Sequence, residues 1–181
     1  MMKQKILGIL FLLLGVQLSA QAGSLQATGS GHTISAAMTQ NIIGPLNFDA
    51  SYTRDFQESN SMTNLGLYLE MGLGPVSGRA GVKTFYADVD GANGRGYAPG
   101  VGFSVTPIPM FSLVGSYYYA NDKTINDNDI DRYRDWSLTV NFHPVSLTNL
   151  YVGYSYEAVD VVGSGRVTFN NGPIVGVSLN F

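Results

Sequence analysis

Apolar and polar residues alternate along most of this chain, most clearly in the segment from residue 64 to residue 86, NLGLYLEMGLGPVSGRAGVKTFY. A period of two is typical of a β-strand with two unlike faces. Gly-Leu-Gly-Pro at residues 72–75 predicts a turn, and the alternation resumes after it. The segment is therefore predicted to form a β-hairpin. One of its faces is continuous hydrocarbon, and the other is small, polar or charged.

The register of this hairpin follows from the predicted turn. Pairing Met71 with Val76 sets Leu69 opposite Gly78. The same register lays Glu70 diagonally across from Arg79, within reach of a long side chain. We therefore expect the two charges to lie together on the polar face.

The same alternation recurs along the rest of the chain and predicts an all-β fold. We expect strands near residues 23–28, 33–40, 46–55, 64–71, 76–86, 97–106, 111–120, 135–142, 150–157 and 175–181. Ten strands are preferred, because the Gly44-Pro45 turn resembles the Gly74-Pro75 turn of the hairpin. Eight strands beginning at Leu46 are the alternative, with the N-terminal segment lying in the lumen or the periplasm.

The connections between these strands alternate between short and long. Short turns are expected at Gly44-Pro45, Gly74-Pro75, residues 107–109 and residues 143–148, and long polar loops at residues 57–61, 88–95, 121–131 and 160–172. Strands of about ten residues with this alternation describe a transmembrane antiparallel up-and-down β-barrel of the outer membrane. Closure of the barrel leaves no unpaired strand edge in hydrocarbon.

Alternation alone also fits a soluble sandwich or a lipocalin-like barrel, so the composition has to decide between them. Charged residues make up 13% of the chain, against about 25% in ordinary soluble domains. A soluble fold would turn a nearly uncharged Gly, Ser, Asn, Thr and Ala face toward water, which is a poor surface for staying dispersed. We therefore expect the apolar face to meet lipid and the small polar face to fill the lumen.

The N-terminus has the pattern of a secretory signal peptide. Lys3 and Lys5 precede an apolar run from residue 6 to residue 16, and Ala20-Gln21-Ala22 is a small-residue cleavage site. The run is shorter than the roughly 20 residues of a spanning helix. We expect residues 1–22 to be removed and residues 23–181 to form a single outer-membrane domain. That domain carries 8 basic and 13 acidic residues, a net charge of −5, which argues against nucleic acid as a partner.

Charged residues on the polar parity are expected to form a network inside the barrel: Asp49, Glu70, Arg79, Lys83, Asp135 and Glu157. A basic side chain turned toward lipid would cost about 2–4 kcal/mol near the bilayer midplane, so inward placement is favoured. Mutually paired charges would plug the lumen and leave a structural or surface-interaction barrel. Incomplete pairing would leave a narrow hydrophilic pore.

Aromatic residues gather near the predicted strand ends, where a membrane barrel carries interfacial girdles. The expected girdle consists of Tyr52, Tyr86, Tyr97, Tyr117, Tyr119, Trp136, Tyr154 and Tyr156. Arg54 and Arg134 fall on the outward parity near the ends of long loops. From there they can reach the phosphates of lipid headgroups.

Several segments together resemble the YfaZ family of small bacterial outer-membrane proteins. They are IIGPLNFDASYTRDF, GPVSGRAGVKTFYADV, YAPGVGFSVTPIPMFSLVGSYYYA and the terminal VSLNF, and the resemblance extends over the mature chain. It implies an outer-membrane barrel and brings no established activity or substrate. Val177, Leu179 and Phe181 also look like the C-terminal signal that the barrel-insertion machinery reads.

Candidate catalytic and metal-binding groups are few. His32 lies in a Gly/Ser loop, where it could pair with an aspartate, and His143-Pro-Val-Ser146 lies at an expected short turn. Neither spacing matches a known constellation, so we expect no catalytic residue, metal or cofactor. The expected function is a structural or surface role in the envelope, with outer-membrane lipid, lipopolysaccharide and the insertion machinery as partners. A narrow porin-like channel and, more distantly, a lipid-modifying enzyme are the alternatives.

Overall fold

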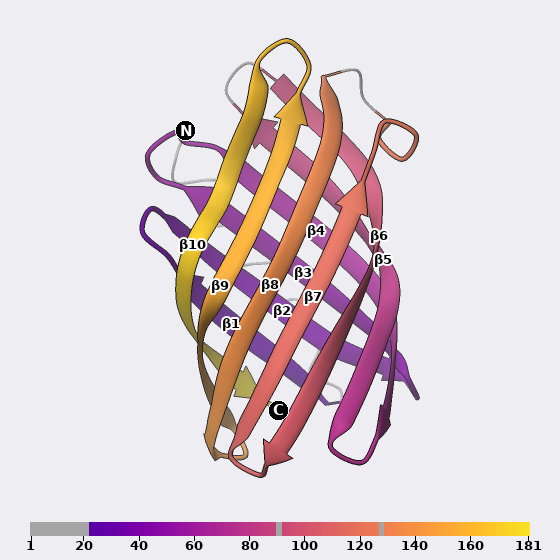
Figure 1. The fold of residues 1–181 in the computed structure, drawn as a ribbon, viewed down its shortest axis with the longest axis vertical. Coiled ribbons are helices and arrows are strands. Elements are labelled where there is room, and N and C mark those ends of the chain that lie inside the picture. Colours follow the sequence, from indigo (N-terminus) through magenta and orange to yellow (C-terminus); the bar gives the residue numbers. More distant parts are fainter. Residues whose placement is uncertain (1–21, 90–91, 127–128) are drawn as a thin grey trace.

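The computed structural model describes residues 22–89, 92–126 and 129–181, and it shows a closed antiparallel β-barrel of ten strands (Figure 1). The strands are β1 Gly23–Gly29, β2 Thr33–Ile43, β3 Leu46–Asp55, β4 Ser61–Leu73, β5 Val76–Val89, β6 Ala92–Ile108, β7 Phe111–Ala120, β8 Ile130–Val145, β9 Thr148–Val161 and β10 Gly165–Asn180. Each strand pairs with its neighbours in the sequence, and β1 pairs with β10 to close the barrel. The preferred strand number of ten is therefore confirmed. None of the described residues lies in a helix that is long and apolar enough to cross a membrane. The predicted signal peptide falls on residues 1–22, of which 1–21 lie outside the described part.

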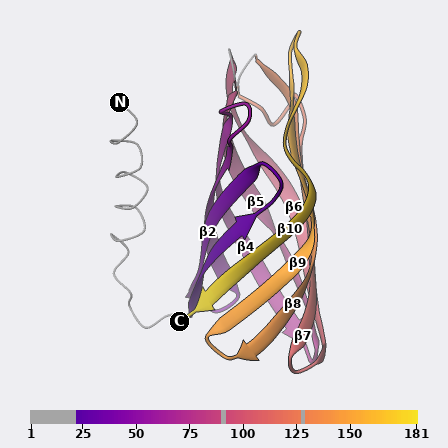
Figure 2. The same ribbon diagram turned by 90° about the vertical axis from the view of Figure 1, so that its left-hand side faces the viewer.

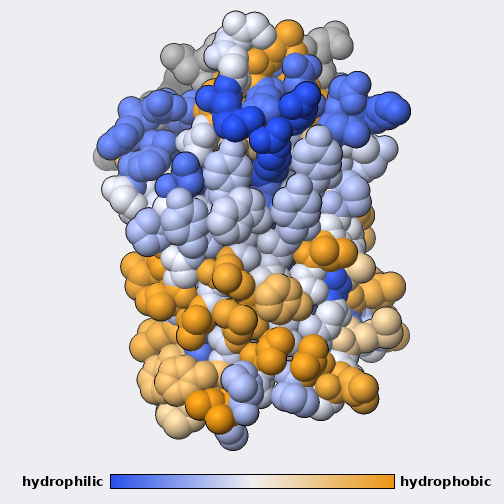
Figure 3. Space-filling model, viewed as in Figure 1, coloured by the Kyte–Doolittle hydropathy of each residue, from blue (hydrophilic) through white to orange (hydrophobic). Residues whose placement is uncertain are grey.

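Side chains divide between the two faces of the wall as the period of two predicts. Leu65, Leu67 and Leu69 are 46%, 47% and 51% exposed on the outer surface, whereas Asn64, Gly66 and Tyr68, which alternate with them in sequence, are buried. On the face shown in Figure 3, hydrophobic residues cover much of the half of the barrel that carries the short turns. Hydrophilic residues gather at the opposite end, where the longer strands project (Figure 3). The barrel therefore turns its hydrocarbon outward.

The register predicted for the β4–β5 hairpin is wrong by two residues. Leu73, not Met71, pairs with Val76, and only Gly74 and Pro75 lie in the turn. Gly74 has a φ of 60°, a left-handed conformation that glycine adopts without steric cost. Glu70 consequently lies directly opposite Arg79 instead of diagonally across from it. Because the shift is an even number of residues, every side chain keeps its predicted face.

Three of the predicted connections are shorter than expected. Strand pairing continues to Asp88–Asn93 and Val89–Ala92 between β5 and β6, and to Val161–Gly165 between β9 and β10, so most of the predicted loops at 88–95 and 160–172 are strand. At the opposite end of the barrel, β8 runs through His143 to Val145 and leaves a short Ser146-Leu147 turn. The β5–β6 and β9–β10 segments extend because their inward residues, such as Val89 and Val161, are buried in one apolar cluster.

The apolar outer wall predicts a depth-dependent response to charge. Leu69 lies at the centre of the outward run of β4 and Leu73 at its turn end, 89% exposed. We expect Leu69→Lys to lower the free energy of unfolding by about 2–4 kcal/mol, and Leu73→Lys by about 0–1 kcal/mol, because the cost of a lysine falls toward the interface. Urea unfolding of protein refolded into lipid vesicles measures both. Equal losses at the two positions would contradict a lipid-facing wall.

Candidate functional site in the barrel lumen

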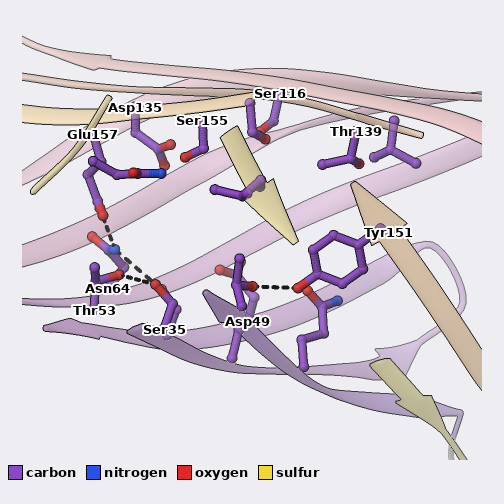
Figure 4. A pocket seen from close by; sticks show the side chains of 18 of the residues that line it. Ser35, Asp49, Thr53, Asn64, Ser116, Asp135, Thr139, Tyr151, Ser155 and Glu157 are labelled. Atoms are coloured by element: carbon purple, nitrogen blue, oxygen red, sulfur yellow. Dashed lines mark hydrogen bonds between the residues drawn. The ribbon is translucent and has the colours of Figure 1, made fainter. Parts of the chain in front are cut away.

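A polar cavity of about 280 Å³ occupies the interior of the barrel. Hydroxyl groups from β1, β2 and the turn between them, and from β3, β7, β8 and β9, dominate its lining: Thr28, Ser30, Thr33, Ser35, Thr39, Ser51, Thr53, Ser116, Tyr118, Ser137, Thr139, Tyr151 and Ser155. Many of them bond to one another, as in the pair Ser35–Thr53 at 2.8 Å and the pair Ser116–Ser137 at 3.0 Å. Figure 4 shows Ser35, Thr53 and Asp49 on one side of this space and Ser116, Ser155 and Asp135 on the other. The lumen is thus lined by hydrogen-bonding groups.

A layer of charged residues lies across the lumen at one end of this cavity. The Lys83 ammonium forms an ion pair with Asp135 and lies 4.3 Å from the ring centre of Tyr118. The Tyr133 hydroxyl lies 3.0 Å from the Glu157 carboxylate and 3.3 Å from the Asp135 carboxylate. Asn64 donates a 3.0 Å hydrogen bond to Glu157 from the other side of the barrel (Figure 4). These contacts join β4, β5, β8 and β9 through buried polar groups.

Five of the six predicted lumen charges line the cavity, namely Asp49, Arg79, Lys83, Asp135 and Glu157. The sixth, Glu70, lies nearer the short turns, where it accepts a 2.9 Å hydrogen bond from Ser77. The expected contact between Glu70 and Arg79 is absent: among the described residues no carboxylate forms an ion pair with Arg79. Its guanidinium instead lies 5.2 Å from the ring centre of Tyr68, and its buried Nε has no hydrogen-bond partner.

Inward glycines make room for the large side chains that fill the lumen. Gly100 pairs with Tyr118, and a Cβ at Gly100 would lie 2.2 Å from the Tyr118 ring. Gly176 pairs with Tyr151, and a Cβ there would lie 2.3 Å from the tyrosine ring. The phenol rings therefore lie flat across glycine on the neighbouring strand. This packing gives a physical reason for the high glycine content.

The end of the lumen beyond the charged layer, away from the short turns, is filled by an apolar cluster. The Phe85 and Tyr133 rings stack at 4.3 Å, and Met62, Val159 and Phe169 are fully buried around them. Ile125, from the β7–β8 connection, joins the cluster, and that connection is held along β6 by a 2.9 Å bond from Tyr97 N to Thr124 O. This cluster was not among the predicted sites. The signal was the presence of apolar residues on both parities near the strand ends, as in Thr-Phe-Tyr-Ala at residues 84–87.

The predicted girdle residues lie on the outer wall, mostly on β5 to β9. Tyr86, Tyr97, Tyr117, Trp136 and Tyr154 are between 37% and 50% exposed, and Tyr52, Tyr119 and Tyr156 are partly buried. Trp136 stacks on Tyr154 at 5.6 Å and on Tyr156 at 6.3 Å. At the C-terminus, Val177, Leu179 and Phe181 all face outward, and Phe181 bonds to the backbone of Gly23.

Both histidines make local contacts. His143 Nε2 lies 3.0 Å from Ser112 Oγ at the short-turn end of the barrel. His32 Nε2 lies 3.5 Å from Asp55 Oδ2, and the other oxygen of Asp55 accepts hydrogen bonds from the backbone of Gln57 and Glu58. The His32–Asp55 contact therefore fastens the β1–β2 and β3–β4 connections to each other. Within the described ranges, no cluster of three or more potential metal ligands occurs.

Comparison with known proteins gives a family and a fold. The family model described as YfaZ precursor matches residues 1–181, the whole chain. No curated protein sequence matches the chain. Among solved structures, the outer membrane protease OmpT from Escherichia coli aligns with a TM-score of 0.54 and 10% identity, over 92% of this chain and 99% of OmpT.

Two channel structures align less closely. The KdgM porin has a TM-score of 0.48 and 12% identity, over 88% of this chain and 99% of KdgM. The outer membrane channel DcaP of Acinetobacter baumannii has a TM-score of 0.46 and 14% identity, over 91% of this chain. This chain spans 60% of the length of DcaP. At 10% identity the likeness to OmpT shows an outer-membrane barrel fold and nothing more specific.

The charged layer predicts non-additive effects of substitution. Lys83→Met leaves the buried Asp135 and Glu157 carboxylates without their cation, and breaking a buried pair in this way costs about 3–5 kcal/mol. We expect Lys83→Met with Asp135→Asn to cost less than the sum of the single substitutions, because one uncompensated charge is removed. Urea unfolding of the four proteins in vesicles gives the coupling energy. Strict additivity would contradict the pairing of these two residues.

Proposed function

This chain belongs to the YfaZ family, and we propose that it is a non-conducting outer-membrane barrel with a structural or surface-interaction role in the cell envelope. The family and the barrel fold give the location in the outer membrane. The role rests on the filling of the lumen, which differs between its two ends. A channel would need a continuous water-filled path for solutes. The packing of the barrel interior therefore decides between a channel and a sealed barrel.

The apolar cluster is the observation that carries this proposal. Phe85, Tyr133 and Phe169 are at most 3% exposed, although they lie on the inner side of the wall. At this level Gly94 on β6 lies against the side chain of Ile130 on β8, beyond the end of β7. Water and ions would have to pass through packed hydrocarbon, and a hydrophobic constriction blocks conduction by dewetting.

The charged layer adds a second barrier below this cluster. Lys83 is engaged by Asp135, and Glu157 is engaged by Asn64 and Tyr133. A transported ion would have to displace contacts that already satisfy these groups. Paired charges of this kind rigidify a small barrel, which suits a structural element of the envelope.

The outer rim supports lipopolysaccharide as a partner. Arg132, Arg134 and Arg166 lie near the ends of β8 and β10, around the single carboxylate of Asp160, and continue the outer wall beyond the aromatic residues. Arg166 Nε donates a 2.7 Å hydrogen bond to the Asp160 carboxylate, and Arg134 lies 3.7 Å from it. These guanidinium groups suit lipid phosphates, which arginine binds in a bidentate manner. The outward C-terminal residues, ending at Phe181, support the insertion machinery as the partner during assembly.

A narrow channel is the second candidate, and the hydroxyl-lined cavity of about 280 Å³ is the observation that favours it. It would require the apolar cluster to open. Enzymatic activity has weaker support. OmpT is a protease, but the carboxylate of Asp55 beside His32 is already engaged by two backbone N–H groups.

Planar-bilayer recording tests the proposal directly. We expect the wild-type protein to give no reproducible conductance steps. The variant Phe85→Ser with Phe169→Ser should give steps, because polar side chains would admit water into the outer part of the lumen. Phe103→Ser is the matched control, since it removes a phenyl ring from the outer wall, where Phe103 is 43% exposed. Reproducible steps from wild-type protein would overturn the proposal in favour of the channel.

A further inference from the structure

The barrel wall is lowest at the hairpin formed by β1 and β2. The β1–β10 ladder ends at Gly29–Val175, while β10 continues upward to Gly165. The short hairpin stops well below the tips of the other strands (Figure 2). Above Val175, therefore, β10 is hydrogen-bonded to β9 on one side and has no β1 partner on the other.

The sequence of β10 is adapted to this free edge. Pro173 lies two residues above the last residue that pairs with β1. Proline has no N–H, and within sheets it is confined to edges, strand starts and bulges. Gly172 beside it has open space around the position of a Cβ. We call the gap between the β1–β2 turn and this part of β10 the seam. Along the seam β10 has a free strand edge, although the barrel is closed below it.

Two spaces meet at this seam. The inner cavity reaches Gly29, Ser30 and Ile174. A groove on the outer wall is lined by the same three residues, together with Gly31, Val152, Gly153, Pro173 and Val175. The polar lumen and the outside of the barrel thus approach each other laterally, between the β1–β2 turn and Pro173.

The two sides of the seam differ in chemistry. On the outside, Val152 and Val175 are 59% and 62% exposed and continue the hydrocarbon band that faces lipid. On the inside, Ser30 and Thr33 bond to each other at 2.6 Å, and Ser35 bonds to Thr53. Further in, the buried Nε of Arg79 has no hydrogen-bond partner. A molecule lying across the seam would find hydrocarbon at one end and hydrogen-bonding groups at the other.

We propose that this seam admits a single-chain amphiphile from the membrane, with its alkyl chain in the outer groove and its polar head in the lumen. The outer groove is continuous with the lipid-facing wall, so its occupant comes from the bilayer. The cavity volume of about 280 Å³ lies near the lower limit of roughly 300–1,000 Å³ for small-molecule sites, which restricts the head to a small group. Three carboxylates against two cations line the cavity, which disfavours an anionic head, and the Ser and Thr lining suits an uncharged head that carries hydroxyl groups. This inference does not depend on whether the barrel conducts, because the path avoids the apolar cluster.

The chain contains no cysteine, which allows a direct labelling test. Ser35→Cys places one thiol on the lumen side of the seam, beside the Thr28 position with which Ser35 pairs. Two probes share one reactive head: N-dodecylmaleimide, which partitions into the bilayer, and N-(2-hydroxyethyl)maleimide, which stays in water. We expect N-dodecylmaleimide to label this thiol in lipid vesicles.

A bulky substitution in the outer groove distinguishes entry from the bilayer through the seam from entry through water. Gly29 faces outward at the seam and has nothing within 4 Å of an added Cβ, so Gly29→Phe places a phenyl ring at the groove. Gly78→Phe is the matched control, because Gly78 is equally open and lies on β5, far round the barrel. We expect Gly29→Phe to slow dodecyl labelling at least about tenfold, with less than about twofold change for the hydroxyethyl probe. Gly78→Phe should change neither rate.

Three results would overturn the proposal. The first is an absence of dodecyl labelling, and the second is dodecyl labelling that Gly29→Phe leaves unchanged. The third is an equal slowing of both probes, which would mean that the seam is an aqueous passage or that the substitution rearranges the cavity. Bilayer recording of the same proteins is a separate measurement. Conductance by the wild-type protein would refute the sealed barrel and leave the labelling result intact.

Discussion

The structure depends on hydrogen bonding between neighbouring strands, because the wall that they form is surrounded by hydrocarbon. In lipid an unpaired N–H or C=O group costs several kcal/mol, so a sheet survives there only if its first and last strands meet. Here β1 and β10 close the ring, and the terminal Phe181 bonds to Gly23 at the lower end of that junction. The β1–β10 ladder is also the shortest of the ten, and its last pair is Gly29 with Val175. The barrel is therefore closed at the place where its wall is lowest.

Closure fixes the inward and outward faces, and the inward face then has to fill a narrow space. Glycine opposite tyrosine, as at Gly100 and Tyr118, lets a large ring lie across the neighbouring strand. Lys83 and Asp135 neutralise each other at mid-depth, and Phe85 with Tyr133 fills the outer end. The interior thus passes from hydroxyls through charge to hydrocarbon. This order separates a small wet cavity from the outer end of the lumen and leaves the β1–β10 seam as its nearest contact with the membrane.

The strand pattern predicted the class of fold and the face of nearly every side chain, but it predicted local geometry less well. The β4–β5 register differs by two residues, because an even shift leaves the alternation unchanged and hydrophobicity cannot detect it. The segments around Asp88 and Asp160 looked like loops because they are rich in turn-forming residues. They pair as strands because Val89, Val159 and Phe169 pack against one another inside the barrel.

The sequence by itself determined that this chain is a barrel with hydrocarbon outside and charges inside, since a period of two and the cost of a charge in lipid are local properties. It also determined the inward placement of Lys83 and Asp135, by parity alone. Only the tertiary structure decided which inward groups meet. Asn64 reaches Glu157 although 93 residues separate them, and Arg79 lies against Tyr68 instead of forming an ion pair. Contacts across a barrel depend on the tilt and stagger of the closed wall, which no single strand encodes.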